Sequence, residues 1–133
     1  MSESAPAPGQ ALAVSAESLY LANLLIAPGL AFLLLAWLWH KHGLTAPALA
    51  RQHLEQTLVA SLCGGGLILV ACAVILAFGG LEWPWTWVIV VLYFVLVHST
   101  LILLGVVGLS HAMAGKPWQF PLLGRAARWI QIK

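Results

Sequence analysis

The chain has 133 residues, of which 62% are hydrophobic and only 8% are charged. Ordinary soluble domains carry about 25% charged residues, so this composition excludes them and indicates a membrane protein. The net charge of +2 is too small to favour nucleic acid as a partner. We therefore expect one small all-α bundle embedded in lipid.

The first elements expected along the chain are a flexible tail and a membrane-spanning helix. Residues 1–16 are rich in Ala, Pro and Ser, which is the composition of a mobile segment. Residues 19–39 are apolar over about 21 positions, which matches a hydrocarbon core of roughly 30 Å. Pro28 and Gly29 fall near the middle of this first span, so we expect the helix to be kinked there.

A polar segment, Thr45–Leu62, follows the first span and leads into the second. Its first residues have the preferences of a helix start, so we expect an interfacial amphipathic helix before the second span. Arg51 and Glu55 are four residues apart and can pair on one face of that helix. With His53, they are expected to stay solvated at the membrane surface and to form a docking site for a partner protein.

The second span is expected over about residues 58–78. Its first half contains Gly64 and Gly65 in small-xxx-small patterns, which allow another helix to approach closely. These two glycines therefore join the expected docking residues. Cys63 and Cys72 lie too far apart along one helix for a disulfide, so we interpret them as small, buried, reduced apolar residues.

The third span is expected over about residues 86–109, which is long enough for a tilted crossing. A basic and aromatic tail, residues 115–133, follows it and is expected to lie along the membrane interface. Together the three spans, the interfacial helix and this tail form a single helical domain over residues 17–133.

The positive charges predict the orientation of the three expected spans. All six Lys and Arg residues fall either between the first two spans or after the third. Positive residues favour the cytoplasmic side of a membrane. We therefore expect a multi-pass protein of the bacterial inner membrane, with its N-terminus outside and its C-terminus in the cytoplasm.

His98 is the strongest single candidate for chemistry, because it lies in the third span. An ionisable group at membrane depth is by default a candidate functional residue, here a haem ligand, a quinone contact or a proton relay. The alternative is a neutral imidazole that bonds a backbone carbonyl or Ser61. No other histidine lies at the same depth, so we expect no cofactor, with haem b kept as an alternative.

The remaining histidines and the acidic residues do not predict a metal site or an enzyme. His40, His42, His53 and His111 lack the spacing of a helical chelate, so metal binding is not expected. The sequence also has no phosphate-binding loop, no nucleophile elbow and no close pair of carboxylates. We therefore expect no catalysis by this chain acting alone.

Two short segments carry a resemblance to a known family. Ala50–Thr57 reads ARQHLEQT, and Gly115–Pro121 reads GKPWQFP. With the order of the spans, they resemble a family of small bacterial membrane proteins of unknown function, related to the chloroplast import component Tic-twenty, which includes the magnetosome proteins of the MamF type. Where the family has an Asn-Phe pair, this chain has Glu55-Gln56. The resemblance implies a small helical membrane protein that is often tied to a larger assembly.

The leading hypothesis is a non-catalytic accessory or scaffold subunit, surrounded by lipid and packed against other membrane proteins or against a second copy of itself. The small-residue faces of the spans and the absence of a self-contained catalytic pattern support it. The alternative is a component of a redox complex that contributes a haem or quinone contact through His98. A further alternative, a transport or translocation element, follows from the chloroplast relative by analogy.

Overall fold

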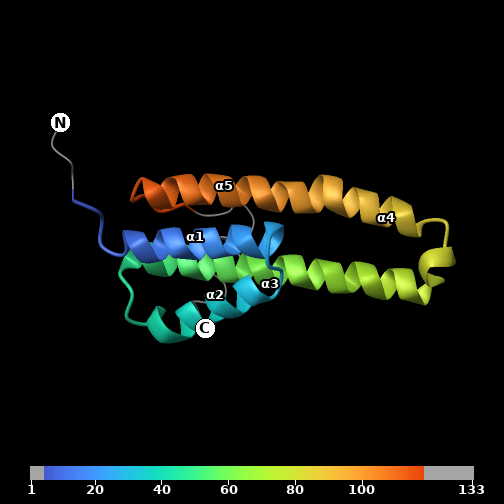
Figure 1. Ribbon diagram of the computed structural model, residues 1–133, viewed down its shortest axis with the longest axis horizontal. Coiled ribbons are helices and arrows are strands. Elements are labelled where there is room, and N and C mark those ends of the chain that lie inside the picture. Colours follow the sequence, from blue (N-terminus) through green and yellow to red (C-terminus); the bar gives the residue numbers. More distant parts are fainter. Residues whose placement is uncertain (1–4, 119–133) are drawn as a thin grey trace.

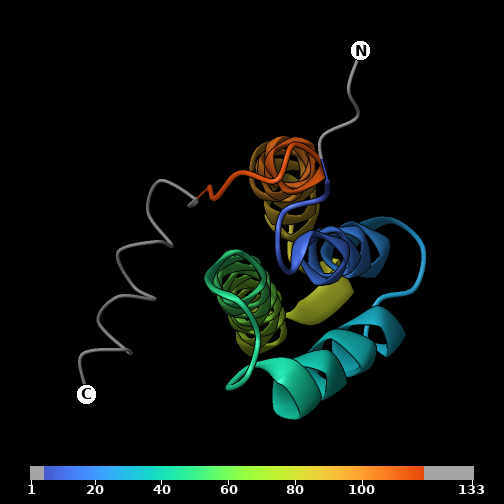
Figure 2. The same cartoon turned by 90° about the vertical axis from the view of Figure 1, so that its left-hand side faces the viewer.

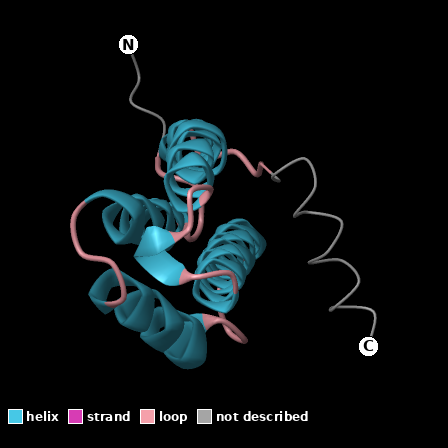
Figure 3. Ribbon diagram, turned by 90° about the vertical axis from the view of Figure 1, so that its right-hand side faces the viewer, coloured by secondary structure: helices cyan, strands magenta, loops and turns pink. Residues whose placement is uncertain are grey.

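The computed structural model describes residues 5–118, and the elements of this part of the chain are all helical (Figures 1 and 3). This confirms the all-α prediction for the described residues. In chain order the elements are α1 (Gln10–Leu25), α2 (Leu30–His42), α3 (Ala48–Ala77), the 3-10 turn η1 (Gly80–Glu82), α4 (Thr86–Leu92), the π-helical turn η2 (Tyr93–His98) and α5 (Ser99–Met113).

Two helices are long and apolar enough to cross a membrane. These are α3 and the continuous helix Thr86–Met113, which is made of α4, η2 and α5. In each, only 11% of the most apolar window is buried inside the protein. The core helix of a soluble protein would be mostly buried, whereas these two helices present their apolar side chains outward. They contain the expected second and third spans.

The expected first span, residues 19–39, forms two helices instead of one. α2 turns back along α1, so the two make a helical hairpin (Figure 1). Gly29 has a positive φ of 87°, a conformation that side-chain-bearing residues rarely adopt. Its N–H donates to the Asn23 side-chain oxygen at 2.8 Å. Pro28 and Gly29 therefore make a turn where we expected a kink, since Asn23 closes the chain reversal locally.

Helix α1 is the centre of the packing. It contacts α2, α3 and α5, and Figure 2 shows it between them. One buried cluster joins Ala16 to Leu35 and Leu54, and the Tyr20 hydroxyl donates to the Leu101 carbonyl at 3.0 Å. We call this part of the molecule, built by α1, α2, α5 and the first half of α3, the four-helix end.

Beyond the hairpin, only α3 and the α4–η2 helix continue (Figure 1). We call residues 65–98 the two-helix arm. Within the arm only Thr86 is buried, so this half of the molecule has no core of its own.

The start of α1 lies beside the end of α5. The Gln10 side chain donates to the Met113 carbonyl at 2.7 Å, and α1 is already helical from Gln10. A flexible tail that extends to residue 16 is therefore wrong over residues 10–16. The α1–α2 hairpin returns the chain to the end from which it began, so the start of α1 and the end of α5 lie at the same end of the helices, and the predicted orientation in the membrane stays a prediction.

The expected interfacial helix is part of α3, which begins at Ala48 and runs without a break into the second span. His53, Gln56 and Thr57 are buried in the four-helix end, so this segment has an inward polar face. Of the expected C-terminal tail, residues 119–133 lie outside the described residues.

Candidate functional site

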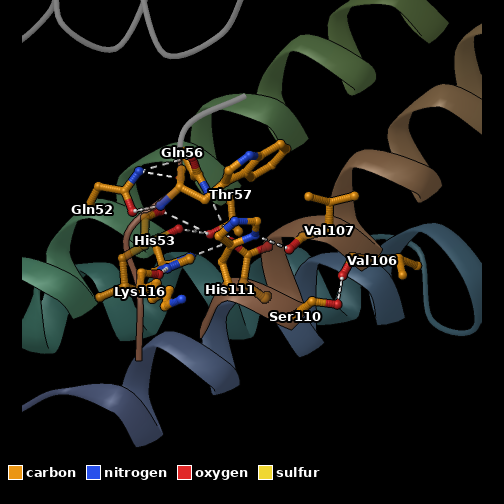
Figure 4. Close-up of polar contacts among 12 residues, drawn as sticks. Gln52, His53, Gln56, Thr57, Val106, Val107, Ser110, His111 and Lys116 are labelled. Atoms are coloured by element: carbon orange, nitrogen blue, oxygen red, sulfur yellow. Dashed lines mark hydrogen bonds and ion pairs between the residues drawn. The ribbon is translucent and has the colours of Figure 1, made fainter. Parts of the chain in front are cut away.

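A polar cluster lies inside the four-helix end, where α1 meets α3 (Figure 4). The Glu17 Oε1 atom lies 2.6 Å from Nδ1 of His53, and both side chains are 0% exposed. The Gln56 amide donates to the same carboxylate oxygen at 2.9 Å. We call Glu17, His53 and Gln56 the buried polar cluster.

The hydrogen-bond partners of His53 define how many protons the His53 ring and the Glu17 carboxylate hold between them. Its Nε2 atom lies 3.0 Å from the Lys116 carbonyl, which can only accept, so Nε2 carries a hydrogen. The short contact on the other side of the ring also needs one hydrogen between Nδ1 and the Glu17 oxygen. Whether this proton is assigned to the ring or to the carboxyl, the pair has no net charge. Burial of two titratable groups is tolerated only in this form.

The segment after α5 is attached to α3 by a second set of contacts. The Trp118 N–H donates to the Gln52 side-chain oxygen at 3.2 Å, and the Gln52 amide donates to the Trp118 carbonyl. His111 stacks on Trp118 with ring centroids 5.7 Å apart, and its Nδ1 contacts the Val107 carbonyl at 2.9 Å. With the His53–Lys116 bond, these contacts attach the C-terminal end of the described chain to α3.

The buried polar cluster is closed. The second oxygen of Glu17 has no hydrogen-bond partner among the described residues, and a Cβ added at Gly108 would lie 2.7 Å from it. The backbone of α5 therefore covers the carboxylate directly. Among the described residues, no group of three His, Cys, Asp or Glu side chains could hold a metal ion. The hydrogen bonds of this cluster hold α1, α3 and the segment after α5 together.

Glu17 was not among the site residues predicted from the sequence; it directly follows the expected flexible tail, residues 1–16. A signal was present, because Ala13, Ala16, Glu17 and Tyr20 follow helical spacing on one face of α1. All four are buried. A small-residue stripe that contains one carboxylate indicates close packing against a polar partner, and His53 is that partner.

The structure separates the expected docking residues into two groups. Arg51 and Glu55 pair at 3.0 Å, with the Arg51 side chain 46% exposed, and Gly65 has open space above its Cα. Arg51 and Gly65 remain on the surface, whereas Glu55 is partly buried, with its side chain 13% exposed. The placement of His53 on the surface is wrong, because its ring is fully buried. Gly64 is also buried, and a Cβ there would lie 3.2 Å from Leu101.

The second candidate site is a groove of about 690 Å³ at the tip of the α1–α2 hairpin. α3 forms one side of it with its small residues, and η2 forms the other with its aromatic residues. We call it the tip groove. Its lining residues are Asn23, Leu24, Pro28, Gly29, Phe32, Ala60, Ser61, Leu62, Gly64, Gly65, Gly66, Ile68, Leu69, Tyr93, Phe94 and His98.

His98 lines this groove and packs edge-on against Phe94, with ring centroids 5.3 Å apart. It makes no hydrogen bond to another described residue, so the expected bond to Ser61 or to a carbonyl is not found. No other histidine lines the groove, so a haem with two histidine ligands would need a second chain.

The two cysteines differ from the expectation in one respect. Cys63 and Cys72 are free thiols, but both are exposed on the outside of α3 where we expected them to be buried. They belong to neither candidate site, because neither residue lines the groove or contacts the buried polar cluster.

Comparisons with models of protein families, with curated proteins and with solved structures give no match. The resemblance noted for the sequence therefore stays a prediction.

Proposed function

We propose that this protein is a non-catalytic accessory or scaffold subunit of a membrane complex, which binds helices of other membrane proteins along its two-helix arm and the outward face of α3. The observation that supports this is the arm itself. From residue 65 to residue 98 two apolar helices continue with only Thr86 buried, so nearly all of their surface is free for other molecules.

One face of α3 has the composition of a helix-packing surface. Its members recur at helical spacing and are not fully buried, with charged residues at one end and leucines on both sides of a central glycine. They are Arg51, Glu55, Leu62, Gly65, Leu69 and Leu76. We call this set the outer stripe of α3. In lipid, helices associate through close packing and polar contacts, and a small residue at the contact allows the backbones to approach.

The proposed orientation follows from the charges and from the hairpin. Lys41, Arg51 and Lys116 all lie at the four-helix end, whereas Glu82 lies in the turn at the far end of the arm. The positive-inside rule then places the four-helix end in or near the cytoplasm. With two crossings and a hairpin that enters the membrane without crossing it, both ends of the described chain are cytoplasmic.

The test is purification of the tagged full chain from membranes in a mild detergent. We expect stoichiometric recovery of at least one larger membrane protein. Leu76→Ala and Glu55→Ala should each reduce this recovery, because they truncate the outer stripe at its apolar and polar ends.

Leu33→Ala is the matched control. Leu33 is 65% exposed on α2, compared with 75% for Leu76 on α3, so the same truncation is made at similar exposure on another helix. Recovery of the chain only as a monomer would contradict the proposal. If the chain were recovered only as an oligomer of itself, the partner would be a second copy of this chain and not another membrane protein.

A further inference from the structure

The tip groove contains polar groups without protein partners. The Ser61 hydroxyl is buried and has no hydrogen-bond partner among the described residues. The Tyr93 hydroxyl and the His98 ring, also in its lining, make no hydrogen bond to any described residue. In hydrocarbon no water is present to satisfy such groups, so each favours a ligand that can hydrogen-bond with it.

The rest of the lining restricts the class of ligand. No Lys, Arg, Asp or Glu is among the described residues that line the groove, so nothing there compensates a phosphate or another charged group. Gly64, Gly65 and Gly66 make one side flat, and Phe94 and Tyr93 place aromatic rings on the other. This shape suits a planar, uncharged ring held between a smooth helix surface and aromatic side chains.

The walls of the groove are fixed by local structure. The Asn23 side-chain oxygen accepts the Gly29 N–H at 2.8 Å, which holds the hairpin tip in its turn. On the other wall, the π-helical turn η2 ends at His98, and the Ser99 hydroxyl donates to the Phe94 carbonyl at 3.0 Å. Short π-helical segments occur frequently at functional sites, because they displace side chains from the regular helical positions.

We propose that the tip groove binds an isoprenoid quinone, with its ring between the α3 glycines and Phe94. The ring carbonyl oxygens accept hydrogen bonds from Ser61, Tyr93 and His98, which are all able to donate. The prenyl tail leaves through the open side into the lipid. A volume of about 690 Å³ is ample for the ring and the first part of the tail. This inference needs the proposed membrane setting but not the proposed partner.

Binding is tested with the full chain in phosphatidylcholine nanodiscs, with decylubiquinone as the probe. An azido derivative of the same quinone is photolysed, and labelled peptides are mapped by mass spectrometry with and without excess decylubiquinone. We expect displaceable label on the α3 glycine segment and on η2. Loss of a hydrogen bond worth about 1.4 kcal/mol lowers the affinity tenfold, so Tyr93→Phe and His98→Ala should each weaken decylubiquinone binding about tenfold.

Ser61→Ala should weaken binding by a similar or smaller factor. Ser110→Ala is the matched control, because the Ser110 hydroxyl donates to the Val106 carbonyl at 2.9 Å outside the groove, as Figure 4 shows. Equal affinity for all these variants, or label spread over the whole arm, would overturn the proposal. Displacement of the label by phosphatidylglycerol as effectively as by decylubiquinone would also overturn it, since the occupant would then be a lipid chain. Failure of the chain to enter nanodiscs would instead refute the proposed membrane setting.

Discussion

Removal of His53 should destabilise the protein far more than removal of Arg51, although both residues lie on α3 and each forms an ion pair, His53 with Glu17 of α1 and Arg51 with Glu55. His53→Ala leaves Glu17 fully buried, with the Gln56 amide still donating to one carboxylate oxygen and no described residue bonding the other. Breaking a buried pair on one side costs about 3–5 kcal/mol, because an uncompensated charge stays inside. Arg51 is 46% exposed, so Arg51→Ala should cost about 0–1 kcal/mol.

The assay is reversible unfolding of the purified chain in mixed micelles, titrated with sodium dodecyl sulfate and followed by circular dichroism. The free energy of unfolding is compared for the wild type, His53→Ala, Glu17→Ala and the double variant. Since the double variant removes both charges together, its loss should be smaller than the sum of the single losses by about 1–3 kcal/mol.

Two results would refute the reasoning on Glu17 and His53. If His53→Ala lowered the free energy of unfolding no more than Arg51→Ala does, the Glu17 carboxylate would be accessible to solvent, contrary to its position in the structure. If the two single losses were additive, the two side chains would not interact in the folded protein.

Two further predictions concern the packing and the topology. Gly108→Ala should lower the free energy of unfolding by about 1–3 kcal/mol, because the new Cβ would lie 2.7 Å from Glu17 Oε2. Gly66→Ala should instead raise the free energy of unfolding by up to about 1 kcal/mol, because alanine has the higher helix propensity and the new Cβ would have nothing within 4 Å. Both are measured by the same titration, and equal effects would contradict the close contact. In a chain whose two native cysteines are replaced by alanine, Ala5→Cys and Leu44→Cys should react with a membrane-impermeant maleimide from the same side, and Leu81→Cys from the opposite side. If Ala5→Cys and Leu81→Cys reacted from the same side of the membrane, the result would support the three-span topology expected from the sequence instead.

Much of the architecture could be predicted from local properties of the sequence. Hydropathy and helix length are read within one segment, so the apolar runs over residues 58–78 and 86–109 predicted the two long helices. The Arg51–Glu55 pair was predicted for the same reason, since its members are one helical turn apart. His98 was singled out because a polar residue inside an apolar run is visible without any knowledge of its neighbours.

The first span and the buried polar cluster required the tertiary structure. A Pro-Gly pair inside an apolar helix is compatible with a kink or with a complete reversal, and the flanking residues do not distinguish the two. The reversal is favoured here because it brings Glu17 of α1 to His53 of α3, a residue 36 positions away.

By itself, the sequence determined that this chain forms long apolar helices, that its Lys and Arg residues fall outside the two membrane-length apolar runs, and that His98 lies in one of those runs. Only the tertiary structure decided that the N-terminal helix turns back, that Glu17 and His53 neutralise each other inside the four-helix end, and that His98 shares the tip groove with Ser61 and Tyr93. The physical reason is that helix formation and hydropathy depend on neighbouring residues, whereas burial of a charge depends on a partner from a distant segment.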